Sequence, residues 1–240
     1  MKIDANSVTF EPQDMAFVKK FGILKATEMA LDYHAEHPNL PFLYDAEQLA
    51  GFLGISRGEL NDIVNHIQKE YKETRLPKKD GTYRSLCVPS IRLRFCQDPI
   101  KEKILPQLPV SKFATAYQKG STTRGNAEPH IGKKFLLKLD ITDFFGSITF
   151  EQVQRTAFNT RYVSRQVGYL LTSLCCKDDS LPQGAATSPA LSNIVMYRFD
   201  NYIGRWCSQR QIAYTRYCDD MTFSSDRPLY GVYQKVKKML

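Results

Sequence analysis

The sequence predicts an α+β fold in which a small antiparallel sheet is backed by helices. Two apolar, β-prone runs flank the adjacent acids Asp219-Asp220, a pattern typical of a β-hairpin with carboxylates at its turn. A further strand is expected over residues 135–141, where successive side chains point to opposite faces. Much of the remaining chain has the apolar spacing of helices, which we expect to cover the sheet.

The composition is that of a basic globular protein. The 240 residues are 42% hydrophobic and 24% charged, enough for one large domain or two small ones. A net charge of +8 favours polyanionic partners, although charge alone does not identify them. No apolar run approaches the ~20 residues that span a bilayer, and the N-terminus lacks a signal-peptide core, so no membrane association is expected. The six cysteines form no C-x-x-C pair, which predicts reduced thiols in a cytoplasmic protein without structural zinc.

The first part of the chain is predicted to be helical. Residues 14–36 carry apolar side chains at helical spacing. Residues 45–52 and 56–71 are predicted as two helices on either side of Gly54, and Ser56-Arg57-Gly58-Glu59 is a capping box for the second. This unit is interpreted as a packed helical hairpin, with a DNA-reading helix-turn-helix as the less favoured alternative.

A basic β-hairpin is predicted next. Lys78 and Lys79 precede Asp80-Gly81, a strong two-residue turn signal. Residues 83–88 are predicted as the returning strand. The hairpin is followed by a basic helical stretch, which makes a phosphate-binding surface more credible than a charge run alone.

The elements after this hairpin surround the predicted sheet. Residues 91–105 are expected to form a helix that Pro99 breaks or kinks. Residues 111–134 are rich in turn-forming residues and are predicted to be loop. Three later segments have helical patterns: 151–176, with a break near residue 159, 188–205 and 230–240.

The acids suggest a chemistry. Adjacent carboxylates repel each other, and a divalent cation would remove that cost. Mg²⁺ prefers carboxylate and phosphate oxygens, so Asp140 from one strand and Asp219 from a neighbouring turn could bridge two ions about 3.5–4 Å apart. In a basic chain this favours two-metal phosphoryl transfer on nucleic acid. The alternative is a solvent-exposed Asp-Asp turn without a catalytic role.

Three motifs occur in a fixed order, at residues 139–145, 181–189 and 217–220. They resemble three successive palm motifs of reverse transcriptases in order, spacing and flanking strands. Asn126-Ala127-Glu128-Pro129-His130, just upstream, resembles the N-A-x-x-H signature of retron reverse transcriptases. The L-P-Q-G form of the middle motif also favours retrons over group II intron enzymes. The resemblance covers about residues 44–225.

The resemblance implies a domain organisation. It predicts an N-terminal helical segment over residues 1–43, a fingers region over 44–130 and a palm over 131–240. The family continues with a primer-grip strand pair and a helical thumb, which are absent from this chain. Because its end has the pattern of an interrupted helix, we expect a truncated or partly represented protein.

The resemblance also implies roles for the acids and their neighbours. Asp140, Asp219 and Asp220 match the metal-binding acids, with Asp140 and Asp219 expected as bridging ligands of two Mg²⁺ ions and Asp220 as an outer or weaker one. Mn²⁺ is the other candidate ion. Phe145 matches the aromatic steric gate that excludes a ribose 2′-hydroxyl, and one of Phe144 and Phe145 is expected in the core.

Nucleotide-binding roles are implied for the fingers and the middle motif. Arg84 matches an arginine that holds the triphosphate, and Lys78 or Lys79 a fingers lysine. A solvated basic hairpin is the alternative for these three. Gln183 matches a residue that contacts the incoming nucleotide or the template.

The signature upstream of the first acid is tied, in retrons, to recognition of the cognate RNA. Asn126 and His130 are therefore RNA-binding candidates, with packing inside the loop as the other interpretation of His130. Two positions depart from the family pattern. Cys218 replaces the usual Ala or Met of the Y-x-D-D turn, and Ala186 stands where proline is frequent.

The predicted function is that of a retron-type RNA-directed DNA polymerase. By resemblance, it binds a structured non-coding RNA, copies it with dNTPs from an internal guanosine 2′-hydroxyl, and leaves a branched RNA–DNA hybrid. Such enzymes act with an effector protein of the same locus in defence against phage. The alternatives are another bacterial reverse transcriptase, of group II intron or diversity-generating type, and a non-catalytic nucleic-acid-binding scaffold.

Overall fold

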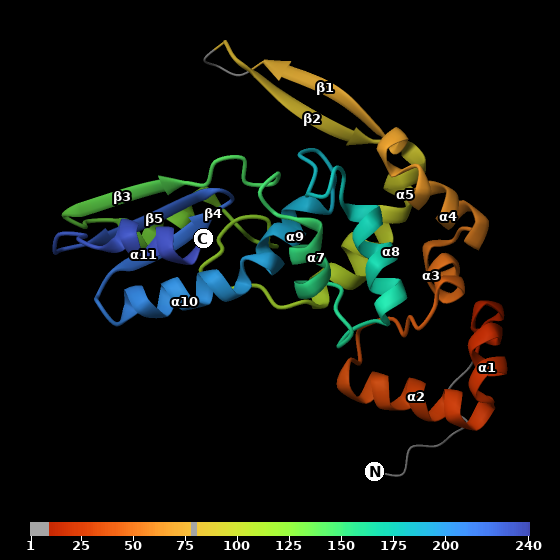
Figure 1. The fold of residues 1–240 in the computed structure, drawn as a ribbon. Coiled ribbons are helices and arrows are strands. Elements are labelled where there is room, and N and C mark those ends of the chain that lie inside the picture. The colour runs from red at the N-terminus through yellow and green to blue at the C-terminus, as the bar shows by residue number, and fades with distance from the viewer. Residues whose placement is uncertain (1–9, 78–80) are drawn as a thin grey trace. The chain divides into compact units, whose positions relative to one another are not determined.

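The computed structural model describes residues 10–77 and 81–240, which belong to two compact units (Figure 1). The first unit consists of Met1–Gln107 and Thr149–Ser188, and the second of Leu108–Ile148 and Pro189–Leu240. Each unit is therefore built from two separate stretches of chain, whereas the predicted domain ranges are continuous. No helix in the described ranges is long and apolar enough to cross a membrane.

The first unit begins with helices. They are α1 (Met15–Phe21), α2 (Ile23–Glu36), α3 (Ala46–Leu53) and α4 (Arg57–Asn65). The predicted helix over 14–36 is interrupted at Gly22, whose φ of 76° is incompatible with a continuing helix. The predicted capping box is confirmed, because Ser56 accepts from the Glu59 amide while the Glu59 carboxylate accepts from the Ser56 amide. The prediction that this helix extends to residue 71 is wrong, since Tyr71 instead opens a strand.

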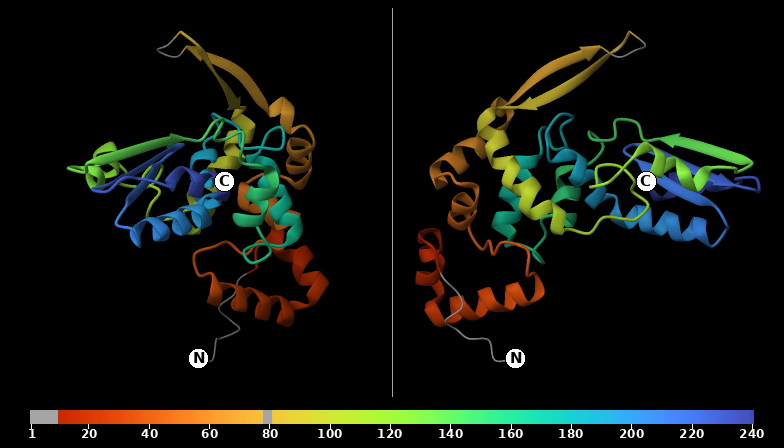
Figure 2. Two further views of the ribbon diagram at one scale, coloured as in Figure 1. Left: turned by 60° about the vertical axis from the view of Figure 1, so that its left-hand side comes forward. Right: turned by 180° about the vertical axis from the view of Figure 1, so that it is seen from behind.

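The basic hairpin is present in the first unit. Strands β1 (Tyr71–Pro77) and β2 (Tyr83–Pro89) pair antiparallel, and Pro77 opposite Tyr83 is the last described pair. The ribbon extends away from the helices α4 and α5 of its own unit (Figure 2). The predicted turn at Asp80-Gly81 falls partly on residues outside the described ranges.

The remaining helices of the first unit complete its core. They are α5 (Ile91–Pro99), which continues as a π-helix over Ile100–Ile104, α7 (Phe150–Thr156) and α8 (Arg165–Cys175). The prediction of a break at Pro99 is confirmed, since regular α-helix ends there. Helix α8 packs against α3, α4 and α5 through apolar residues such as Leu171 and Leu174, which are fully buried.

The second unit contains a three-stranded antiparallel sheet, as the sequence predicted. Its order is β3-β5-β4, from β3 (Phe135–Asp140), β5 (Asp220–Ser225) and β4 (Ala213–Tyr217). Helix α10 (Tyr197–Ser208) packs against β4, and α11 (Val232–Met239) follows the sheet. The α+β class is therefore observed directly.

Two sequence predictions fail around this sheet. The helix expected over 188–205 is divided into α9 (Ser188–Val195) and α10, because Met196 leaves helical geometry with ψ near −3°. The segment expected to be loop contains α6 (Thr123–Ala127), which forms because the Thr122 hydroxyl caps it by accepting from the Gly125 amide.

Candidate active site

The register of the sheet brings the three acids to one end of the second unit. Strands β3 and β5 pair so that Asp140 lies directly opposite Asp220. One step further, the Ile141 amide donates to the Asp219 carbonyl at 3.2 Å. Residues opposite each other on antiparallel strands have Cβ atoms about 4.5–5.5 Å apart. The sequence placed these acids on separate elements, and the pairing of β3 with β5 makes them neighbours.

The acidic hairpin closes with a two-residue turn, Cys218-Asp219, since Tyr217 pairs with Asp220. Cys218 has a φ of 60°, the left-handed conformation that tight hairpin turns require and that side chains disfavour. The Cys218 carbonyl accepts a hydrogen bond of 2.7 Å from Nη1 of Arg216. The guanidinium of Arg216 therefore holds the strained backbone of Cys218, the residue immediately before Asp219.

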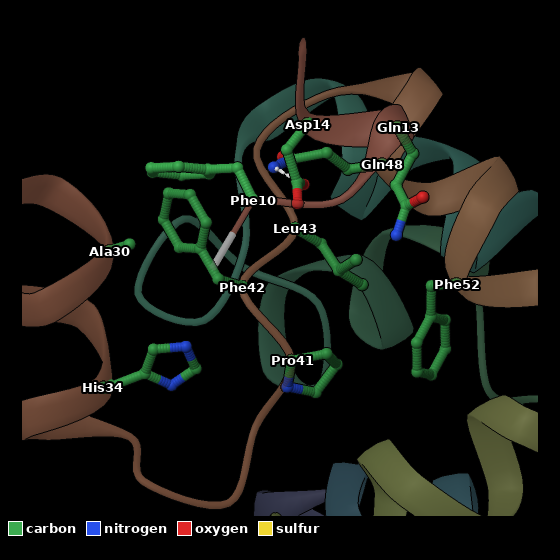
Figure 3. Close-up of a pocket in the computed structure, with 10 residues that line it drawn as sticks. All are labelled: Phe10, Gln13, Asp14, Ala30, His34, Pro41, Phe42, Leu43, Gln48 and Phe52. Carbon is green, nitrogen blue, oxygen red and sulfur yellow. Dashed lines mark hydrogen bonds between the residues drawn. The ribbon is translucent and has the colours of Figure 1, made fainter. Parts of the chain in front are cut away.

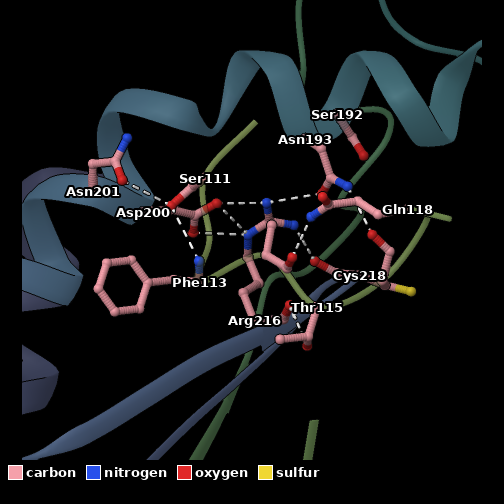
Figure 4. A network of polar contacts seen from close by, with 12 residues as sticks. Ser111, Phe113, Thr115, Gln118, Ser192, Asn193, Asp200, Asn201, Arg216 and Cys218 are labelled. Carbon is pink, nitrogen blue, oxygen red and sulfur yellow. Dashed lines mark hydrogen bonds and ion pairs between the residues drawn. The ribbon is translucent and has the colours of Figure 1, made fainter. Parts of the chain in front are cut away.

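Arg216 belongs to a buried polar network (Figure 4). Both it and Asp200 of α10 are fully buried, and Nη2 of Arg216 lies 2.7 Å from Oδ2 of Asp200. Nη2 also donates to Oδ1 of Asn193 at 3.1 Å, and the Tyr214 hydroxyl donates to Oδ1 of Asp200 at 2.8 Å. Burial opposes the charged form of Arg216, yet its hydrogen bonds with Asp200 hold its pKa above the ordinary value. The ion pair is complete because every charged oxygen has a donor.

The same network holds the loop that precedes α6. Asn193 donates through Nδ2 to the Ala116 carbonyl at 2.8 Å, and the Thr115 amide donates to the Arg216 carbonyl at 2.8 Å. Tyr117, which follows Ala116 in the chain, has a φ of 59° and shares a side-chain hydrogen bond with Cys218. Burial, followed by that hydrogen bond, raises the pKa of Tyr117, so its hydroxyl stays protonated. Sequence analysis missed Tyr117 because it lies in a segment without periodicity.

The two adjacent phenylalanines have different environments. Phe144 is only 5% exposed, and the Arg216 guanidinium carbon lies 5.6 Å from its ring centroid. Phe145 is half-buried, with its ring centroid 6.5 Å from that of Tyr117. The expectation that one of the pair belongs to the core is therefore met by Phe144. Phe145 retains the partial exposure that contact with a nucleotide requires.

The acids have the chemistry of ligands for a hard divalent cation, the kind of metal that reverse transcriptases typically use. Like charges directly opposite on two strands destabilise a sheet, and a cation between Asp140 and Asp220 would offset that repulsion. At present Asp220 has Nζ of Lys138 3.8 Å away. Within residues 10–77 and 81–240, no group of three or more His, Cys, Asp or Glu side chains is arranged to hold a metal.

Of the predicted nucleotide-binding residues, Arg84 and Gln183 belong to the first unit and Phe145 belongs to the second. Arg84 is exposed on β2, and Lys78 and Lys79 lie outside the described residues. Gln183 is half-buried, and its carbonyl accepts from the amide of Cys87 on β2 at 2.7 Å. The turn of the middle motif is thus tied to the strand that carries Arg84.

The residues of the upstream signature contact the sheet of the second unit. Oδ1 of Asn126 accepts from the Thr115 hydroxyl at 2.6 Å. The two ring nitrogens of His130 lie 2.7 Å from the Ser224 hydroxyl and 2.9 Å from that of Thr215. Burial lowers the pKa of His130, which favours its neutral form. These contacts agree with the loop-packing interpretation of His130.

A separate pocket of about 250 Å³ lies in the first unit (Figure 3). Its walls are mostly apolar, from α2, α3 and the segments next to them, and Nε2 of Gln48 donates to Oδ1 of Asp14 at 2.6 Å. None of the predicted site residues lines it, so it is no part of the candidate active site.

Comparison with known proteins gives the family. The model of the family described as "Reverse transcriptase (RNA-dependent DNA polymerase)" matches residues 76–240. The Retron Ec86 reverse transcriptase of Escherichia coli is 30% identical, over 84% of this chain and 63% of the relative. The Retron Mx65 reverse transcriptase of Myxococcus xanthus is 33% identical, over 78% of this chain and 49% of the relative. The Retron Ec83 reverse transcriptase of Escherichia coli is 35% identical, over 71% of this chain and 58% of the relative.

The chain thus spans 49% to 63% of the length of these three relatives. Among solved structures, telomerase from Candida albicans in complex with a fragment of telomeric RNA is 13% identical, with a TM-score of 0.47, over 72% of this chain and 40% of that one. At that level the likeness is weak, and the assignment depends on the family match. Since that match covers more than half of the residues and the relatives are retron enzymes, the chain belongs to the reverse transcriptase family, among its retron-type members.

Proposed function

We propose that this protein is an RNA-directed DNA polymerase that copies a partner non-coding RNA into DNA by two-metal nucleotidyl transfer. The observation that carries the proposal is the register that sets Asp140 opposite Asp220, with Asp219 in the adjoining turn, in a chain of the reverse transcriptase family. In this proposal residues 131–240 are the palm, and the second unit contains the sheet of that range and its three acids. Residues 44–130 are the fingers, and residues 1–43 are the N-terminal helical segment.

Each residue has a role in this proposal. Asp140 and Asp219 would hold two Mg²⁺ or Mn²⁺ ions, and Asp220 would be the outer ligand. When bound, such ions lower the pKa of the attacking hydroxyl and neutralise the triphosphate. Phe145 lies under the sugar and excludes a 2′-hydroxyl. Arg216 positions the turn that carries Asp219, through the Cys218 carbonyl.

The first unit supplies further contacts with the incoming dNTP. Arg84 grips triphosphate oxygens with its planar guanidinium, as Lys78 or Lys79 does with a point charge. Gln183 contacts the nucleotide or the template.

The retron relatives support a proposal for the partners. The RNA is a structured non-coding RNA, and the product is a branched RNA–DNA hybrid, made in the cytoplasm. Asn126 and His130 contribute to recognition of that RNA by shaping the loop against the sheet as well as by direct contact. An effector protein of the same locus completes an anti-phage system.

The second candidate is a nucleic-acid-binding scaffold without turnover, in which Asp140, exposed at the end of β3, belongs to an acidic surface and not to a catalytic centre. Replacing Asp219 with Asn separates the two functions in the full-length protein. The polymerase predicts that D219N binds RNA like the wild type and extends a primer at least about 10³-fold more slowly, because a bridging carboxylate is lost. Unchanged extension by D219N would refute the assigned role of this acid. A wild-type protein that binds RNA and makes no DNA would support the scaffold.

The type of reverse transcriptase is tested by the nucleic acid that copurifies with the native-length protein. A branched RNA–DNA hybrid from one adjacent locus is expected. Heterogeneous RNA without linked DNA would rule out the retron activity and leave another type of reverse transcriptase or the scaffold.

A further inference from the structure

The solvent-facing side of α10, within the second unit, forms a shallow groove of about 440 Å³. The residues that line it are polar, cationic or aromatic: Tyr197, Arg198, Asn201, Tyr202, Arg205, Trp206 and Gln209. The opposite face of the helix is buried and includes Phe199, Ile203 and Cys207. None of the lining residues belongs to the three motifs or to the upstream signature, so the groove has no role in the proposed chemistry.

Two aromatic rings of this groove are held by cations that lie beside it. The Arg210 guanidinium carbon lies 4.4 Å from the ring centroid of Trp206, and Nη1 of Arg210 donates to the Trp206 carbonyl at 3.1 Å. Nζ of Lys235, on α11, lies 4.6 Å from the ring centroid of Tyr202 and donates to its hydroxyl. Tyr202 nevertheless remains 43% exposed. The rings are oriented by their neighbours and still accessible.

The charge of this surface has one sign. The single carboxylate in α10 and α11 is that of Asp200, which is fully buried against Arg216. Neither helix carries an exposed carboxylate, and the exposed cations of these helices and of the turn after α10 are Arg198, Arg205, Arg210, Lys237 and Lys238. A solvated helix face ordinarily mixes both signs. A surface with cations alone is complementary to a polyanion.

We propose that this groove binds a single strand of nucleic acid. Bases stack on Tyr202 and Trp206 while the backbone phosphates pair with Arg198 and Arg205. Stacking on aromatic side chains beside a positively charged track is how proteins hold single strands without reading their sequence. Tyr, Trp and Arg are also common at protein interfaces, but a face on which no exposed carboxylate of α10 or α11 balances the arginines favours a polyanion.

The chain offers a direct probe of this site, since Trp206 is the single tryptophan among the 240 residues. Tryptophan fluorescence of the chain is titrated with oligoadenylate of roughly 12 nucleotides, a length comparable with the sites of single-strand-binding proteins. Saturable quenching is expected from stacking. The experiment contains EDTA and no dNTP, so it does not depend on polymerase activity. A protein that fails to polymerise can still show quenching, and an active polymerase can fail to show it.

Two further ligands identify what the groove recognises. Oligodeoxyadenylate of the same length compares DNA with RNA, and quenching by either supports the proposal while their affinity ratio shows which strand is preferred. Heparin, a polyanion without bases, should compete with the oligonucleotide and leave the fluorescence unchanged. RNA that binds without any change in Trp206 fluorescence would overturn the proposal. Quenching by heparin equal to that by RNA would refute the stacking.

Substitutions of the groove residues show which side chains contribute to the affinity for oligoadenylate. Tyr202→Ala should weaken oligoadenylate binding roughly tenfold, the loss of one stacked base. Arg198→Ser combined with Arg205→Ser should reduce the salt slope by about 1.4, since each phosphate contact on a single strand contributes about 0.7. The matched control replaces Lys19 and Lys69, exposed cations of the first unit, and lowers the net charge equally.

The control separates a local site from general charge. The Lys19 and Lys69 variant should bind oligoadenylate with an affinity and a salt slope close to those of the wild type. Circular dichroism checks that all variants fold. Equal weakening by the control and the groove variants would overturn the proposal, because the effect would then come from net charge alone.

Discussion

Arg216 is the residue on which the geometry of the acidic turn depends most directly. Its guanidinium satisfies Asp200 and Asn193 and donates to the Cys218 carbonyl in a fully buried position. A buried charge is costly without a partner, and removing one member of such a pair leaves the other unpaired. Arg216 therefore couples the stability of the second unit to the conformation of the peptide before Asp219.

Arg216→Met should destabilise the second unit by about 3–5 kcal/mol, because Asp200 is left buried without a cation. The double variant Arg216→Met, Asp200→Leu should recover most of that loss, since both charges are then replaced by apolar groups. It should still extend primers poorly, because nothing holds the Cys218 carbonyl. Urea unfolding and primer extension measure the two effects. A double variant with normal extension would show that Arg216 acts through stability alone.

The adjacent phenylalanines provide a second prediction at this scale. Phe145→Ala should raise the ratio of rNTP to dNTP incorporation roughly tenfold or more, with a smaller effect on stability than a core substitution, because Phe145 is only half-buried. Phe144→Ala should instead cost about 3–5 kcal/mol, as for other core phenylalanines. Single-nucleotide incorporation and urea unfolding of both variants check this. The assignment of the gate is wrong if Phe144→Ala, rather than Phe145→Ala, admits ribonucleotides.

At the scale of elements, a close backbone approach ties the middle motif to the basic hairpin of the first unit. Besides the bond from the Cys87 amide to the Gln183 carbonyl, Gly184 lies against β2 with a φ of 125°. A Cβ on Gly184 would lie 2.8 Å from the Cys87 carbonyl oxygen. Glycine is required there for both reasons, since neither that φ nor that space accommodates a side chain.

Gly184→Ala should therefore destabilise the protein more than Gly231→Ala. Gly231 also has a positive φ, of 78°, yet nothing lies within 4 Å of its missing Cβ. The control should cost about 1–2 kcal/mol from the backbone alone, and Gly184→Ala should add roughly 1–3 kcal/mol of overpacking. Denaturant midpoints of the two variants give the comparison. Equal costs would mean that β2 moves away freely from the turn.

At the scale of the whole molecule, the net charge of +8 sets how the protein meets nucleic acid. Binding through phosphate contacts releases counterions, so affinity falls steeply with salt.

The affinity for single-stranded RNA should fall with a slope of about −3 or steeper in log K against log salt. That slope corresponds to four or more phosphate contacts at about 0.7 each. Filter binding between about 50 and 200 mM salt measures it. A slope near zero would show that the basic charge is not used for RNA binding.

The sequence by itself determined the local features of this protein. The acidic hairpin, the alternating strand before Asp140 and the capping box at Ser56 all depend on residues close together in the chain. The order of the three motifs likewise identified the family that the comparison shows. The helix expected over 56–71 was too long because periodicity does not detect where a strand takes over.

Only the tertiary structure decided which residues surround the acids. It selected Phe144 for the core over Phe145, paired Arg216 with Asp200 sixteen residues away, and brought Tyr117 to Cys218. The physical reason is that strand register and burial result from contacts between distant segments, whereas propensity and periodicity describe neighbours. The division of each unit into two stretches of chain has the same origin.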